Sequence, residues 1–169
     1  MPSPARQLPF DPIAEARRHW DSRWSGGAPM AAATSIMRAQ QIVLARVDEA
    51  LKPFGLTFAR YEALVLLTFS RQGSLPLGKM GERLMIHPTS VTNIVDRLEG
   101  QGLVERLDHP TDRRTTLGQI TAKGRALVEQ ATKAVVAVDV GISGLTPAET
   151  AELTELLGKL RSASGDYEA

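Results

Sequence analysis

The chain has 169 residues, of which 43% are apolar and 23% charged, and it contains no cysteine. This length is typical of one domain with helical extensions, and the apolar fraction is high enough for a buried core. The absence of cysteine excludes disulfides, Cys-ligated metal centres and thiol-based catalysis or redox sensing. Twenty Lys and Arg residues against nineteen Asp and Glu residues give a net charge of +1, so nucleic-acid binding would depend on where the charges lie.

Other function classes find little support in the sequence. The three histidines are widely separated, and we find no glycine-rich phosphate loop, no paired carboxylates and no nucleophile with a base. We therefore expect no enzymatic activity, no cofactor and no metal. The longest apolar runs have five residues, whereas a membrane span needs about twenty. With no signal peptide in the proline-rich first ten residues, we expect a cytoplasmic protein that does not enter the membrane.

The N-terminal third of the chain predicts two helices. Asp11 and Pro12 form a cap and a first helical position, which predicts a helix over about 11–24. The segment 25–29 contains two glycines and a proline and predicts a break. A longer amphipathic helix follows over about 30–52, and Pro53 and Gly55 end it.

The middle of the chain predicts three helices and then a change of period. Thr57 is placed to cap a helix over about 58–70 that is apolar on nearly every side, so we expect it to be the central buried helix. A loop with Gly73 and Pro76 leads to a short helix over 77–85, and Pro88 begins another over about 88–101. The segments 103–107 and 115–120 then read as two strands of a β-hairpin with a polar, basic tip.

Two more helices complete the pattern. The first is predicted over about 122–142 after Thr121, with Gly144 as its stop. The second, over about 147–162, begins with the capping-box residues Thr146 and Glu149. Its leucines fall on one side, and their exposure would make a monomer insoluble, so they predict a dimer; they are Leu153, Leu156, Leu157 and Leu160.

The predicted fold is therefore mainly α with a small β-hairpin wing. We divide it into an N-terminal extension helix (1–29), a winged helix-turn-helix region for DNA binding (57–121), a helical dimerisation region (30–56 and 122–163) and a flexible tail (164–169).

The exposed face of the helix over 88–101 carries small polar side chains. Short side chains let a helix approach the base edges of the major groove, where hydroxyls and amides donate and accept hydrogen bonds. A solvated face on an ordinary amphipathic helix would look the same. The side chains concerned are Thr89, Ser90, Thr92 and Asn93.

The tip of the predicted hairpin carries Arg113 and Arg114 beside Asp112. Arginines at such a tip suit a narrow minor groove, and the aspartate could hold a neighbouring guanidinium in a bidentate geometry. Taken alone, an Asp-Arg-Arg turn is also a common surface pattern. Its place after a helix-turn-helix favours a wing, and residues 57–125 support this with ten basic against seven acidic residues.

Three motifs carry a family resemblance. The stretch from Val95 to Arg106 (VDRLEGQGLVER), the segment Pro110–Arg114 (PTDRR) and the segment Ile120–Gly124 (ITAKG) resemble the MarR family of bacterial transcriptional regulators. The resemblance extends over about residues 30–162. It implies a homodimer with intertwined terminal helices, and one winged helix-turn-helix per subunit placed on a pseudo-palindromic operator.

The resemblance also implies roles for individual residues. The helix over 88–100 would be the recognition helix, and its four small polar side chains would contact bases and phosphates. Arg114 would enter the minor groove with Asp112 orienting it, and Arg113 would contact a phosphate. Arg97 would either contact DNA or tie the helix to the wing through Asp112. His87 could reach a phosphate, although a histidine before a helix is more often a turn residue.

Many members of the family release DNA when a small phenolic or anionic molecule binds between the dimerisation helices and the winged region. The N-terminal helix with Trp20 is similar to that of the urate-responsive branch, in which the tryptophan pairs with an acid at the position of Glu62. Phe69 stands where that branch has an arginine, so other planar ligands fit equally well. Alternatively, Trp20 and Trp24 only fasten the extension to the dimer. The candidate ligand residues are Trp20, Arg38, Tyr61 and Glu62.

The sequence thus predicts a DNA-binding transcriptional regulator, a homodimeric repressor released by a small aromatic or anionic ligand. The alternative is a helical adaptor that does not respond to ligands and uses a winged fold for protein contacts.

Overall fold

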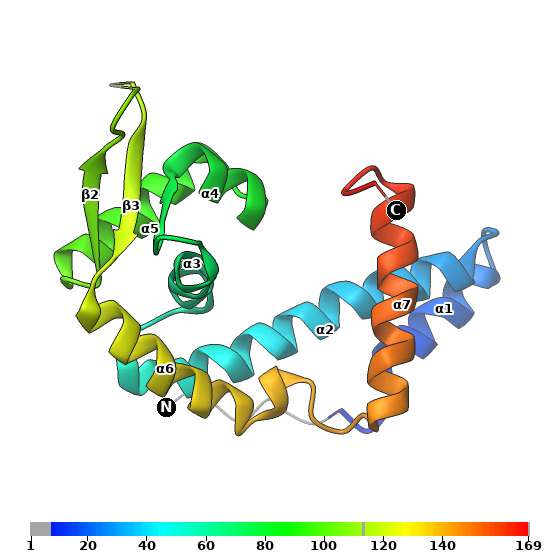
Figure 1. Ribbon diagram of the computed structural model, residues 1–169. Helices are drawn as coiled ribbons and strands as arrows, with labels where there is room; N and C mark the ends of the chain where they lie inside the picture. Colours follow the sequence, from blue (N-terminus) through cyan, green and yellow to red (C-terminus); the bar gives the residue numbers. More distant parts are fainter. Residues whose placement is uncertain (1–7, 113, 169) are drawn as a thin grey trace.

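The computed structural model describes residues 8–112 and 114–168 and is mainly helical, with one small antiparallel sheet (Figure 1). This confirms the predicted fold class. The helices and strands in chain order are α1 (Pro12–Asp21), α2 (Gly27–Leu51), the 3-10 turn η1 (Lys52–Phe54), α3 (Phe58–Phe69), β1 (Ser74–Pro76), α4 (Leu77–Leu84), α5 (Pro88–Gly100), β2 (Val104–Asp108), β3 (Thr116–Ile120), α6 (Ala122–Val136), the 3-10 turn η2 (Asp139–Gly141) and α7 (Pro147–Ala163).

The N-terminal extension is fastened to the start of α2. The Trp20 indole Nε1 donates to the carbonyl of Ser25 at 2.9 Å, and its ring packs edge-on against Trp24. The Asp21 carboxylate accepts from the backbone N–H of Gly27 at 3.1 Å. A side chain at Gly27 would overlap that carboxylate, which explains why glycine opens the helix. Helix α2 consequently starts before Pro29, and the predicted break over 25–29 is shorter than we expected.

The core of the described chain surrounds α3. Ala63, Leu64 and Leu67 are completely buried there, as the sequence predicted. Phe69, however, is 81% exposed, so α3 is not covered on every side. Its N-terminus also differs from the prediction, because the carboxylate of Asp48, rather than the Thr57 side chain, accepts from the backbone N–H of Phe58 at 2.7 Å. The other fully buried large side chains are Val47, Leu51, Met80, Val91, Val95, Leu98, Leu103, Val104 and Val135.

The sheet has a strand that the sequence did not predict. Its order is β1-β3-β2, with β3 in the centre and antiparallel to both neighbours. The predicted loop around Pro76 is in fact β1, where Pro76 lies opposite Leu117. A proline is tolerated in this strand because it lies at the edge of the sheet.

Helix α6 ends earlier than predicted. The helix stops at Val136, and Asp139 and Val140 adopt positive φ angles of 50° and 52°. Gly141 then approaches α2 so closely that a Cβ atom would lie 2.9 Å from the carbonyl oxygen of Val43. The Gly141 carbonyl accepts from Arg46 at 2.9 Å, and this contact with α2 replaces the last turn of the predicted helix.

Helix α7 begins with the predicted capping box of Thr146 and Glu149 and buries none of its residues within the chain. Residues 164–168, which we expected to form a flexible tail, fold back onto the helix through an ion pair between Arg161 and Asp166 and a hydrogen bond from Tyr167 to the Gly158 carbonyl. Among the helices of the described residues, none combines the length and the apolarity that a bilayer span requires.

Candidate nucleic-acid interface

Helix α5 presents an apolar face to the core and a polar face to solvent. Val91, Val95 and Leu98 are buried against the core. The opposite face carries the predicted contact residues, all of which are exposed: Thr89, Ser90, Thr92, Asn93 and Arg97. The structure therefore brings these side chains together on one accessible face.

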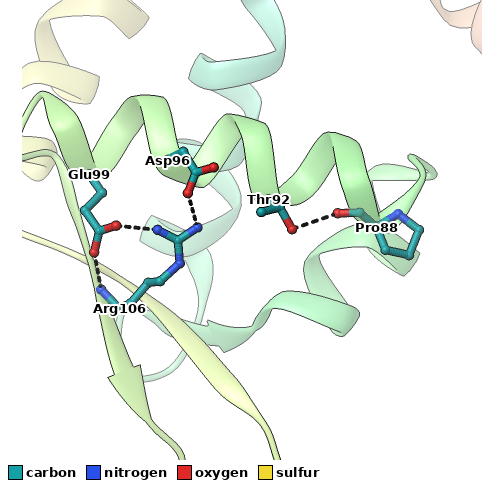
Figure 2. A network of polar contacts seen from close by, with 5 residues as sticks. All are labelled: Pro88, Thr92, Asp96, Glu99 and Arg106. Atoms are coloured by element: carbon teal, nitrogen blue, oxygen red, sulfur yellow. Dashed lines mark hydrogen bonds and ion pairs between the residues drawn. The ribbon is translucent and has the colours of Figure 1, made fainter.

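The start of α5 is capped by a residue that the sequence ranked low. The Nδ1 atom of His87 accepts from the backbone N–H of Thr89 at 3.2 Å, so His87 is the N-cap of the helix. The Thr92 hydroxyl donates back to the Pro88 carbonyl at 3.2 Å (Figure 2). Ser90, by contrast, has no side-chain hydrogen bond to another described residue, and its hydroxyl is available to a ligand.

The wing turn is organised by the carboxylate of Asp112. One oxygen accepts from the backbone N–H of Arg114 at 3.0 Å, and the other accepts from the Thr115 hydroxyl at 2.7 Å. These bonds lower the pKa of Asp112, with the Thr115 hydroxyl as the larger cause. Among the described residues, the carboxylate contacts Arg114 through the backbone N–H and not through the guanidinium that we expected it to hold. Arg113 lies outside the described residues.

The tie between helix and wing is made by Arg106 of β2 and not by Arg97. The Arg106 guanidinium pairs with Asp96 at 2.5 Å and with Glu99, and its backbone N–H donates to Glu99 at 3.2 Å (Figure 2). The predicted tie from Arg97 through Asp112 was therefore wrong. Arg106 was missed because an ion pair between a strand and a helix leaves no periodic signal in a sequence.

The electrostatics of Arg106 favour its charged form. Burial alone would lower its pKa, but the hydrogen bonds and charges of Asp96 and Glu99 outweigh that effect, so the pKa of Arg106 is raised. The guanidinium therefore keeps its charge across the accessible pH range, and it partly neutralises two carboxylates on α5.

A second feature is a cavity of about 410 Å³ between α3 and α6. Its volume lies in the range of small-molecule sites. Its lining is mostly apolar, with one cation and one anion, and consists of Tyr61, Val65, Thr68, Phe69, Val128, Glu129, Thr132 and Lys133. The Tyr61 and Thr132 hydroxyls share a hydrogen bond of 3.0 Å on this wall.

Of the four predicted ligand residues, only Tyr61 lines this cavity. Glu62 follows Tyr61 on α3 but does not line the cavity, and burial raises the pKa of its carboxyl group. Arg38 is exposed on α2. Trp20 lies in α1, at the opposite end of α2 from α3 (Figure 1), and a helix of 25 residues is ~37 Å long. One chain therefore does not bring Trp20 together with Tyr61 and Glu62. The described residues also contain no cluster of His, Asp and Glu placed to hold a metal ion.

Comparison with known proteins agrees with this geometry. Residues 59–116, which span α3 to the first residue of β3, match the model of the MarR family. Sco5413, a MarR family transcriptional regulator from Streptomyces coelicolor, is 56% identical, and its structure superposes with a TM-score of 0.79 over 85% of this chain and 100% of that chain. The chain belongs to the MarR family of transcriptional regulators.

Two other solved MarR-type structures bear on the site. Sco3205 of Streptomyces coelicolor, solved in complex with DNA, is 25% identical with a TM-score of 0.75 over 83% of this chain and 90% of that chain. BpsR of Bordetella bronchiseptica, whose DNA binding is regulated by 6-hydroxynicotinic acid, is 29% identical with a TM-score of 0.69 over 76% and 91%. MarR-family regulators bind DNA and are not enzymes.

Proposed function

We propose that this MarR-family regulator is a homodimeric, cytoplasmic repressor that binds a pseudo-palindromic operator and is released by a small aromatic or anionic ligand. The observation that carries the DNA-binding part is the exposed polar face of α5 beside a wing that bears Arg114. The α5 side chains would enter the major groove, and Arg114 would enter the adjacent minor groove.

The homodimer is supported by apolar side chains that a single chain leaves uncovered. Leu153, Leu156 and Leu160 of α7 are 39%, 56% and 53% exposed, and Ile36 and Met37 in the first half of α2 are also exposed. A symmetric dimer would bury such a surface and space two recognition helices about one DNA turn, ~34 Å, apart.

The ligand is supported by the cavity between α3 and α6. Tyr61, Val65 and Phe69 offer apolar and aromatic surface for a planar ring, and Lys133 offers a cation for an acid group. Regulation of the relative BpsR by an aromatic acid supports the same class of molecule here.

The DNA-binding proposal is tested at Arg114. An operator selected from a random-sequence pool, or footprinted on the protein's own promoter, serves as the probe. We expect Arg114→Ala to weaken operator binding by about 1–3 kcal/mol, because a minor-groove arginine is lost, while the dimer stays intact. Gel shift measures the affinity, and sedimentation measures the dimer. An unchanged gel shift would contradict the wing assignment.

Salt dependence separates this proposal from the adaptor alternative. If the dimer neutralises several phosphates, the logarithm of the binding constant should fall with the logarithm of salt concentration at about −0.9 per contact. A protein that uses its winged fold only for protein contacts would select no operator, and any DNA binding would lack this salt dependence.

The ligand proposal is tested by matched acids and amides. We expect 6-hydroxynicotinic acid or benzoate to raise the melting temperature, because a ligand that binds only the folded state stabilises it by mass action. The corresponding amide should raise it less, and Lys133→Gln should remove this preference for the acid. If none of a panel of aromatic acids and purines shifts the melting temperature or quenches the tryptophans, the ligand proposal fails.

A further inference from the structure

The connection from the recognition helix to the wing is short and contains two glycines. Gly100 is the last residue of α5, and Gly102, at φ +70°, turns the chain into β2. Two backbone hydrogen bonds hold this turn, from Gly102 to the Glu99 carbonyl at 2.8 Å and from Leu103 to the Leu98 carbonyl at 2.9 Å. They hold the wing only where it joins α5, at the opposite end of the strands from Arg114.

Further along β2 the strand leaves the core. Val104 is buried, whereas Glu105, Leu107 and Asp108 are exposed. Arg106 is the exception, because its side chain is 25% exposed and reaches back to α5. In the sheet, Arg106 lies opposite Gly118 of β3, the strand that follows the wing tip. Holding Arg106 against α5 therefore also holds β3 in place.

The carboxylates that hold Arg106 lie on the helix that presents the DNA-facing side chains. Asp96 and Glu99 are one turn apart on α5 and are 54% and 41% exposed. Without a cation between them, both would repel nearby phosphates. The Arg106 guanidinium therefore has two separable effects, a brace between helix and wing and a partial neutralisation of charge.

We propose that Arg106 is a positioning residue that sets the orientation of the wing relative to α5, so that the helix and Arg114 reach adjacent grooves at the same time. This inference rests on the proposed function, because it concerns how the two DNA-contacting elements act together. Arg106 itself need not touch DNA.

A double-mutant cycle between Arg106 and Arg114 tests the inference. Residues that act independently show additive effects, and departures from additivity measure coupling. In the otherwise wild-type protein, Arg114→Ala should weaken operator binding about 5- to 150-fold. In the Arg106→Met background, the same change should weaken it less than about threefold, because the wing is already misplaced. Asp96 and Glu99 are about half-exposed and stay hydrated without their partner, so Arg106→Met should still fold.

Two control variants separate positioning from charge. Arg97→Met removes one cation from α5, where Arg97 pairs with no other described residue, and its effect should be additive with Arg114→Ala. The variant Asp96→Asn/Glu99→Gln/Arg106→Met removes the two carboxylates together with the guanidinium. It should still show the reduced Arg114→Ala effect. If Arg114→Ala regains its full effect in this triple variant, Arg106 acts through charge alone and the inference fails. Additive effects of Arg106→Met and Arg114→Ala in the double-mutant cycle would also overturn it.

A measurement without DNA keeps this result distinct from the proposed function. Because the chain has no cysteine, Asn93→Cys and Thr111→Cys place two unique spin labels on α5 and the wing. With labelled protein diluted in unlabelled protein, the distance distribution should be narrow with Arg106 present and broad in Arg106→Met. Equal widths would overturn the positioning role even if the operator is bound. Failure of the wild-type protein to select any operator would instead overturn the proposed function.

Discussion

Asp112 shows how a single carboxylate organises the turn at the tip of the wing. Its two oxygens accept from the Arg114 amide and the Thr115 hydroxyl, and both bonds favour the ionised form. The pKa of Asp112 is therefore lower in the folded than in the unfolded chain. A group whose pKa is lowered by folding stabilises the fold above its unfolded pKa, and this contribution disappears as the pH falls through the folded pKa. We expect the wing turn to loosen only in acid, below the ordinary range of an aspartate.

Replacement of this carboxylate should loosen the turn at neutral pH. Asp112→Asn removes the charged acceptor, so the amides of Arg114 and Thr115 should become more mobile, with lower heteronuclear NOE values, while the melting temperature barely changes. Asp108→Asn is the control, since Asp108 is an exposed carboxylate at the end of β2. It should leave those NOE values as they are. If Asp112→Asn also leaves them as they are, the turn does not depend on the carboxylate.

Helices and strands with a long periodic pattern could be predicted from the sequence, whereas elements defined by their partners could not. Strands β2 and β3 and helix α5 were predicted within one residue at each end. Strand β1 is three residues long and exists because it pairs with β3, so no period marks it. The end of α6 was misplaced because its apolar pattern continues through Val138 and Ile142. The close packing of Gly141 on α2 overrides that pattern.

The same division holds for the candidate interface. The polar face of α5 could be predicted, because side chains three and four residues apart share a helix face. The hydrogen bonds of Asp112 and the ion pairs of Arg106 could not be predicted. The first depend on where the turn closes, and the second depend on which helix packs against β2. The N-cap role of His87 could not be predicted for a related reason. Its role as the N-cap comes from a ring nitrogen that happens to meet the Thr89 amide, whereas Ser, Thr, Asp and Asn are the residues that usually mark a cap.

The whole chain divides its apolar surface unevenly between core and solvent. The C-terminal half of α2 enters the core through Val47 and Leu51, while Ile36 and Met37 in its first half remain exposed. Helix α7 contributes nothing to the core, and it lies away from the winged region (Figure 1). In the proposed homodimer a second copy covers this exposed apolar surface, so dimerisation and DNA binding should be lost together.

A charge on the apolar side of α7 tests this coupling. We expect Leu156→Glu to give a monomer, because a buried, unpaired carboxylate strongly opposes association. Operator affinity should then fall by far more than any single contact provides, since a monomer presents one recognition helix instead of two. Ala151→Glu is the matched control, because at 100° per residue position 151 lies on the other side of the helix from Leu153, Leu156 and Leu160. That variant should remain dimeric and bind normally. A Leu156→Glu protein that sediments as a dimer and shifts the operator at wild-type concentrations would place the subunit interface elsewhere.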